Sequence, residues 1–160
     1  MQEEQLILGI DPGFDRLGFG FLQVCGSVVK VVDYGVITTD RESTFEERLK
    51  QIADDLRSLL LQFKPDVMGI EKLFFAQNTT TAMDVAEARG VVRLAAAEHS
   101  VPVVEFTPAQ IKKALTGDGK ANKAAMEMMI TKLLNLPAVP KPDDAADALA
   151  VALTASTSRW

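Results

Sequence analysis

The first apolar stretch of the chain ends abruptly at a carboxylate. Residues 6–10 read Leu-Ile-Leu-Gly-Ile and lead directly into Asp11, and a Pro-Gly pair then ends the extended pattern. Because side chains alternate between the two faces of a strand, Asp11 is expected to share a face with Ile7 and Gly9. A carboxylate at the edge of an apolar sheet is costly unless a cation or a donor meets it.

The rest of the chain alternates between strand and helix patterns. Residues 17–25 and 28–38 are β-rich segments joined by a Gly-Ser turn, and with the first strand they predict an antiparallel meander. Further strands are predicted over 66–70 and 101–106, and helices over 44–63, 80–98, 107–115, 121–134 and 143–156. This order predicts an α/β layer fold with a mixed sheet, in a single domain covering residues 1–160.

Two helix starts carry recognisable capping signals. Thr44 with Glu47 three residues later predicts a capping box. Thr107 followed by Pro108 predicts a cap with proline in the first helical position.

Carboxylates gather at the start of the last predicted helix, where Asp143, Asp144 and Asp147 lie within five positions. Asp144 and Asp147 are three apart and so share one helical face. A single aspartate there is explained by capping, but three are not. The helix dipole is expected to keep these carboxylates ionised.

Asp11 and Glu71 each end a predicted strand, where ligands collect in open α/β sheets. If these strands are neighbours and the last helix packs across them, the Asp11 and Glu71 carboxylates lie close to those of Asp144 and Asp147. Such hard oxygen ligands favour Mg²⁺ or Mn²⁺ over Zn²⁺. Two ions about 3.5–4 Å apart could hold the attacking and leaving oxygens of a phosphoryl displacement.

The net charge of −5 argues against nucleic acid, because counterion displacement by basic groups drives that binding. However, the segment from Glu105 to Asn135 contains five lysines and only three acidic residues, so it is locally basic.

The acidic N-terminus, the lone Cys25 and the absence of a long apolar run predict a soluble, cytoplasmic protein.

Four motifs together resemble the RuvC family, bacterial Holliday-junction resolvases of the ribonuclease H-like superfamily. In chain order they are Gly9-Ile10-Asp11-Pro12-Gly13, Ile70-Glu71-Lys72-Leu73-Phe74, Ala88-Arg89-Gly90 and Asp144-Ala145-Ala146-Asp147-Ala148-Leu149-Ala150. The similarity extends from Leu6 to about Ala155. It implies a ribonuclease H-like, mixed five-stranded sheet, with three antiparallel strands followed by two parallel ones, flanked by helices.

The resemblance also implies an activity. The chain is expected to be a Mg²⁺-dependent crossover junction endodeoxyribonuclease, a homodimer that binds a four-way DNA junction and nicks two opposed strands symmetrically in recombination and repair. Two Mg²⁺ ions per active site are implied, with Mn²⁺ as a substitute. A RuvA-RuvB branch-migration complex is the implied partner.

The resemblance assigns roles to individual residues. The implied metal ligands and catalytic acids are Asp11, Glu71, Asp144 and Asp147. Lys123 is implied to offset charge on the scissile phosphate, and the implied DNA contacts are Phe74, Lys112, Lys120 and Lys123. Phe74 would stack on bases at the opened crossover. Asp143 matches no ligand and is expected to be the helix cap, and the helix around Gly90 corresponds to the dimer interface.

Three other functions fit parts of the pattern. A related nuclease acting on ribosomal RNA precursors shares the fold, but the Phe74 loop and the Asp144–Asp147 spacing favour the junction enzyme. Actin-like ATPases and sugar kinases share the Gly-Ile-Asp-x-Gly turn, but they are longer and contain two such domains. A non-catalytic junction-binding scaffold would need to have lost an acidic ligand, and all four are present.

Overall fold

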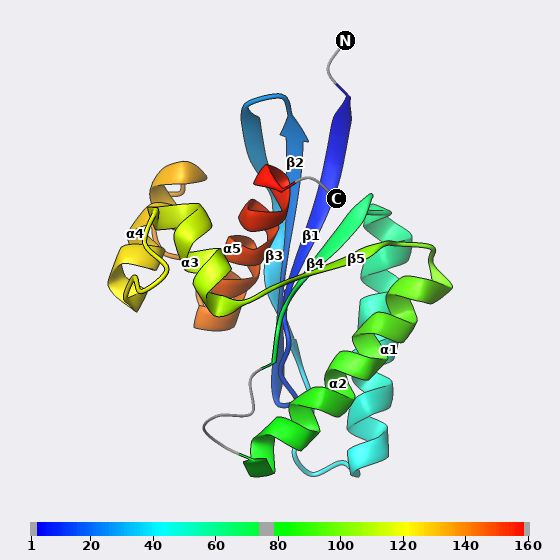
Figure 1. Ribbon diagram of the computed structural model, residues 1–160. Coiled ribbons are helices and arrows are strands. Elements are labelled where there is room, and N and C mark those ends of the chain that lie inside the picture. The colour runs from blue at the N-terminus through cyan, green and yellow to red at the C-terminus, as the bar shows by residue number, and fades with distance from the viewer. Residues whose placement is uncertain (1–2, 74–78, 159–160) are drawn as a thin grey trace.

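A five-stranded sheet separates two groups of helices in the computed structural model, which describes residues 3–73 and 79–158 (Figure 1). The elements are, in chain order, β1 (Glu4–Asp11), β2 (Arg16–Cys25), β3 (Val28–Thr38), α1 (Phe45–Phe63), β4 (Val67–Glu71), α2 (Thr79–Glu98), β5 (Val103–Phe106), α3 (Pro108–Thr116), α4 (Lys123–Leu133) and α5 (Asp143–Thr157).

The strands lie in the order β3-β2-β1-β4-β5. The pairs β1–β2 and β2–β3 are antiparallel, whereas β1–β4 and β4–β5 are parallel, which confirms the predicted mixed sheet. Ile10 is in register with Ile70. Asp11 and Glu71 therefore leave two neighbouring strands at the same edge of the sheet.

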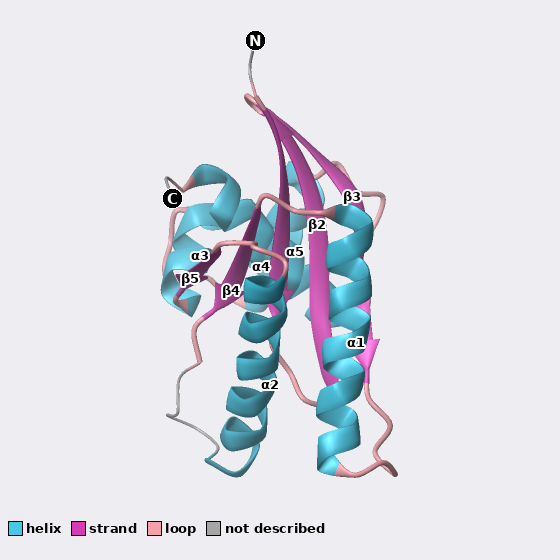
Figure 2. Cartoon of the chain, turned by 90° about the vertical axis from the view of Figure 1, so that its right-hand side faces the viewer, coloured by secondary structure: helices cyan, strands magenta, loops and turns pink. Residues whose placement is uncertain are grey.

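The two faces of the sheet have separate cores. α1 and α2 cover one face, while α3, α4 and α5 lie against the other (Figures 1 and 2). Leu8 and Ile10 pack with α1 and α2, whereas Ile7 packs with α5. Asp11 alternates with Ile10 along β1, so it lies on the α5 face with Ile7, as predicted.

Glycines let α5 press directly on the sheet. α5 is alanine-rich and buried over most of its length. A Cβ built on Gly9 would lie 2.0 Å from the Ala148 carbonyl oxygen, and one built on Gly18 would lie 1.9 Å from the Asp144 carbonyl oxygen. Only glycine permits this approach, and it brings the first turn of α5 to the end of β1.

Helix capping agrees with the sequence at two helices and differs at α5. The predicted capping box is present at Thr44, and the predicted cap at Thr107 is also a capping box, completed by Gln110. The prediction that Asp143 caps α5 is wrong: Pro142 occupies the cap position without a side-chain hydrogen bond. The Asp143 carboxylate instead pairs with Lys123 and Lys141, because two lysines attract it away from the backbone.

Candidate active site

Four carboxylates from three elements meet at one edge of the sheet. Asp11 ends β1, Glu71 ends β4, and Asp144 and Asp147 lie in the first turns of α5. The charge of Asp11 is influenced by each of the other three. Segments distant in sequence thus bring these carboxylates close enough to affect the charge of Asp11.

Burial and repulsion make the Asp11 charge costly. The pKa of Asp11 is raised from 3.8 to about 8, first by burial and then by Asp147, Glu71 and Asp144. A buried carboxylate surrounded by other carboxylates favours its proton unless a cation is near. Asp11 is thus the acid that gains most from a bound cation.

Glu71 and Asp147 show the same effect. The pKa of Glu71 is raised by burial and by Asp147, and Lys112 opposes that rise. The pKa of Asp147 is raised by desolvation, with Lys123 opposing the rise and Asp144 adding to it. Desolvation therefore works against the helix dipole at this carboxylate, while Lys123 supports its charged form.

Asp144 faces Arg16 of β2. The Arg16 Nη2 atom lies 3.1 Å from the Asp144 Oδ2 atom. This contact lacks the alignment of a hydrogen bond, and the buried oxygen has no hydrogen-bond partner among the residues that the structure describes. A buried carboxylate oxygen without a partner is suited to a cation.

These observations test whether the acids fit a metal. Within residues 3–73 and 79–158, no set of three or more His, Cys, Asp or Glu side chains is already gathered closely enough to hold an ion. Like charges separate when nothing neutralises them, and Asp144 is drawn towards Arg16. The oxygen-only donor set, the raised pKa of Asp11 and the unpartnered Asp144 oxygen fit a hard divalent cation.

The four acids line three neighbouring hollows. One of about 710 Å³ includes Arg16 and Asp144, and it shares Val85 with a second hollow of about 280 Å³ that includes Asp11. The second shares Glu71 with a third of about 220 Å³, which contains Asp147 and both predicted phosphate-binding lysines, Lys112 and Lys123. Each hollow thus shares a lining residue with the next, and each contains at least one of the acids.

The predicted DNA contacts differ in their positions. Lys112 and Lys123 line the third hollow with Glu71 and Asp147, and the Lys123 ammonium also pairs with Asp143. Lys120 lines a different hollow, beside the loop between α3 and α4. Phe74 lies outside the described residues.

Two arginines at the acidic group were missed as site residues by the sequence reasoning. Arg16 contacts Asp144, and Arg89 lines the hollow with Asp11 and Glu71 while its Nη2 atom lies 3.1 Å from Glu105. The position of Arg16 follows from the hairpin register that pairs Asp11 with Gly18. The sequence alone does not fix that register, so it carried no signal for Arg16.

No helix in the described part of the chain is long and apolar enough to cross a membrane. Cys25 is a free thiol, half-buried in β2.

The sequence matches proteins of one kind over nearly all of its length. A family model described as crossover junction endodeoxyribonuclease RuvC matches residues 7–155. A protein of that name from Pseudothermotoga lettingae is 50% identical over 147 residues, covering 92% of this chain and 91% of the relative. Another, from Gloeobacter violaceus, is 53% identical over 149 residues, covering 92% of this chain and 86% of the relative.

Solved structures give the same result. The structure described as T. thermophilus RuvC in complex with Holliday junction substrate has a TM-score of 0.89 at 35% identity, covering 94% of this chain and 92% of that one. The yeast mitochondrial Holliday junction resolvase Ydc2 has a TM-score of 0.64 at 14% identity, covering 92% and 77% of the two chains. At that identity the second match shows a shared fold.

Proposed function

Because the chain belongs to the RuvC family of crossover junction endodeoxyribonucleases, we propose that it resolves four-way DNA junctions by symmetric, metal-dependent nicking of two opposed strands. One observation carries this proposal: Asp11 lies where Glu71, Asp144 and Asp147 all act on its charge, in a hollow that shares lining residues with one that contains arginines and one that contains lysines. Family membership confirms the resemblance found from the motifs. The names of the relatives do not favour the alternative, a nuclease of ribosomal RNA precursors.

The four acids are the proposed catalytic residues and metal ligands. Asp11, Glu71, Asp144 and Asp147 offer only carboxylate oxygens, which suits two Mg²⁺ ions, with Mn²⁺ as a substitute. When bound, such ions supply an activated water nucleophile and stabilise the leaving oxygen of the cleaved phosphodiester. The raised pKa of Asp11 explains why this carboxylate would be fully ionised at neutral pH only with cations present.

The basic side chains have a separate task, which is to hold the phosphate. Lys112 and Lys123 lie beside Glu71 and Asp147 in the third hollow, so a phosphate drawn to the acids and their cations would meet both ammonium groups. Pairing with Asp143 raises the pKa of Lys123, which therefore keeps its charge. A fixed positive charge there offsets the charge that builds on the phosphate in the transition state. Phe74 and Lys120 are proposed as further DNA contacts.

We also propose that the enzyme is a homodimer whose interface includes the outer face of α2. Met83, Glu87, Gly90 and Leu94 follow each other at helical spacing along its exposed side. A Cβ on Gly90 would meet nothing within 4 Å, so no packing among the described residues accounts for this glycine. A second copy seated on α2 would account for it and cover the apolar residues.

Replacing Leu94 by Glu is expected to weaken the dimer at least about tenfold, because a charge would be buried at the interface. Leu94 is 54% exposed in the single chain, so folding should be unaffected. The control is Leu61→Glu on α1, where the side chain is 64% exposed. Sedimentation equilibrium measures both variants; equal dimerisation of the two would contradict an α2 interface.

The domain organisation, the location and the partner of the enzyme are proposed from its family. We propose that residues 1–160 form one nuclease domain, that it acts in the cytoplasm, and that a RuvA-RuvB branch-migration complex delivers its substrate. Family membership supports these assignments. Co-migration of the chain with that complex on a junction would test the last of them.

The function is tested with a synthetic four-way junction labelled on each strand in turn. In Mg²⁺ we expect paired nicks at matching positions in two opposed strands, leaving 5′-phosphate and 3′-hydroxyl ends that a ligase reseals. A linear duplex of the same sequence and a structured RNA serve as controls. Faster cleavage of the RNA, or no junction cleavage in Mg²⁺ or Mn²⁺, would contradict the proposal.

A further inference from the structure

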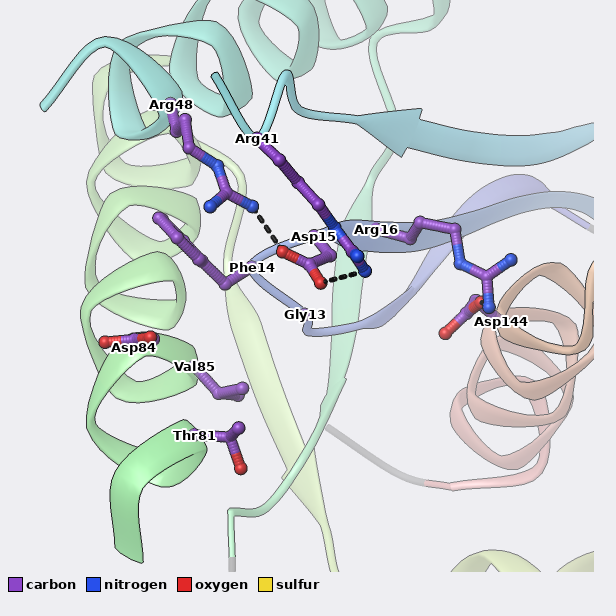
Figure 3. A pocket seen from close by; sticks show the side chains of 10 residues that line it. All are labelled: Gly13, Phe14, Asp15, Arg16, Arg41, Arg48, Thr81, Asp84, Val85 and Asp144. Carbon is purple, nitrogen blue, oxygen red and sulfur yellow. Dashed lines mark hydrogen bonds and ion pairs between the residues drawn. The ribbon is translucent and has the colours of Figure 1, made fainter. Parts of the chain in front are cut away.

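The hollow beside Asp144 contains basic side chains that the proposed chemistry does not use. It lies between the turn after β1, the segment before α1, one side of α2 and the start of α5 (Figure 3). Its three arginines are Arg16, Arg41 and Arg48, and its three aspartates are Asp15, Asp84 and Asp144. The three arginines differ in how strongly their neighbours hold them.

Arg48 is committed to the fold. Its guanidinium carbon lies 3.9 Å from the centre of the Phe14 ring, and its Nε donates a hydrogen bond of 2.9 Å to Thr39. It also pairs with Asp15, and its side chain is only 12% exposed. Arg48 therefore anchors the wall of the hollow.

Arg41 shares its aspartate with Arg48. Its Nη2 atom lies 2.7 Å from Asp15, the carboxylate that Arg48 already neutralises, so two guanidinium groups share one aspartate (Figure 3). The Arg41 side chain is 79% exposed, and an ion pair at that exposure is weak. A phosphate could recruit Arg41 at little cost.

Arg16 depends on the state of Asp144. Its side chain is 52% exposed, and its contact with Asp144 lacks hydrogen-bond alignment. Once the Asp144 carboxylate is neutralised by a bound cation, little holds the guanidinium there. Arg16 would then remain beside the acidic group as an unpaired cation.

The position of this hollow would place Arg16 and Arg41 beside the backbone of a DNA strand cut at the acids. It adjoins the hollow of Asp11 at Val85, and that one adjoins the lysine hollow at Glu71. The acids are thus flanked by Arg16 and Arg41 on one side and by Lys112 and Lys123 on the other. A strand cut at the acids has backbone phosphates on both sides of the scissile one, and a guanidinium can bind a phosphate with two hydrogen bonds.

We propose that Arg16 and Arg41 form a second phosphate site for the cleaved strand, on the side of the acids opposite Lys112 and Lys123, and that Arg16 becomes available to it when Asp144 binds a divalent cation. This inference rests on the proposed function. It adds a substrate contact, and a coupling between cation and DNA, to the four acids and two lysines.

The test is junction affinity measured by fluorescence anisotropy, in Ca²⁺ and in EDTA, at several salt concentrations. In Ca²⁺, Arg16→Ala and Arg41→Ala are each expected to weaken binding about threefold to tenfold and to lower the salt slope by about one. Arg16→Lys should restore part of the loss. The control is Arg57→Ala, a half-buried arginine that pairs with Glu98.

In EDTA, Arg16→Ala should resemble the Arg57→Ala control, because Arg16 is then held by Asp144. If Arg16→Ala and Arg41→Ala match the control in Ca²⁺ while the wild type binds and cuts junctions, the phosphate site is wrong and the proposed function stands. An equal loss for Arg16→Ala in EDTA and in Ca²⁺ overturns the coupling. Failure of the wild type to bind a junction overturns the proposed function and this inference with it.

Discussion

Replacing Asp11 by Asn is expected to slow junction cleavage at least about a thousandfold, since the loss of a central charged ligand removes several kcal/mol of transition-state stabilisation. Asn keeps the shape of the side chain but not the charge that attracts cations. Asp11 is the acid on which Glu71, Asp144 and Asp147 all act. Single-turnover cleavage of a labelled junction in Mg²⁺ and in Mn²⁺ measures the effect.

Junction binding by the Asp11→Asn variant should be retained or improved, because one negative charge near the DNA phosphates has been removed. The matched control is Asp55→Asn, an exposed position on α1 that should cut at the wild-type rate. Cleavage by Asp11→Asn within a few-fold of wild type would show that the reaction does not depend on this carboxylate.

The same variant has an effect on stability that depends on pH. The pKa of Asp11 is about 8 in the folded chain and near its ordinary 3.8 when unfolded. Between these values the folded state holds a proton that the unfolded state releases, so without divalent cations the free energy of unfolding falls as pH rises from about 4 to 8. Asp11→Asn lacks this fall and should be several kcal/mol more stable than wild type at pH 8.5, because each unit of pKa difference corresponds to about 1.4 kcal/mol, but not at pH 4. Urea unfolding in EDTA at both pH values measures the difference.

Replacing Gly18 by Ala is expected to damage both the fold and the site. The new Cβ would lie 1.9 Å from the Asp144 carbonyl oxygen, so β2 or α5 must move. We expect a loss of about 3 kcal/mol in the free energy of unfolding from this overpacking. Displacement of Asp144 should slow cleavage about a hundredfold under conditions where the variant remains folded.

The control for this substitution is Gly119→Ala, where the new Cβ would come no closer than 3.4 Å to Ala109. Its free energy of unfolding should change by no more than about 0.5 kcal/mol. Urea unfolding and single-turnover cleavage are measured for both variants. Wild-type stability and cleavage in Gly18→Ala would mean that α5 does not need its close contact with β2.

The sequence predicted the parts of the fold that depend on local chemistry. Alternation along residues 6–11 placed Asp11 on the correct face, and helical spacing placed Asp144 beside Asp147. The capping box at Thr44 and the Thr107 cap followed by Pro108 marked two helix starts correctly. The convergence of the acids required only that the two strands be neighbours, which the register of Ile10 with Ile70 provides.

Features that depend on tertiary contacts could not be predicted in this way. Asp143 has the sequence of a cap, yet Lys123, twenty positions earlier, draws its carboxylate away. The dipole argument for Asp147 omitted the desolvation that raises its pKa. Arg16 meets Asp144 only because Gly18 lets α5 pack against β2.

The most direct measurement of the central claim is a crystal structure of the chain soaked in Mn²⁺, with anomalous scattering used to locate the ion. We expect anomalous density between Asp11 and the first turn of α5, within reach of Glu71, and none there in crystals of Asp11→Asn. Density confined to other parts of the surface, or unchanged in the variant, would mean that these carboxylates do not form the metal site of the enzyme.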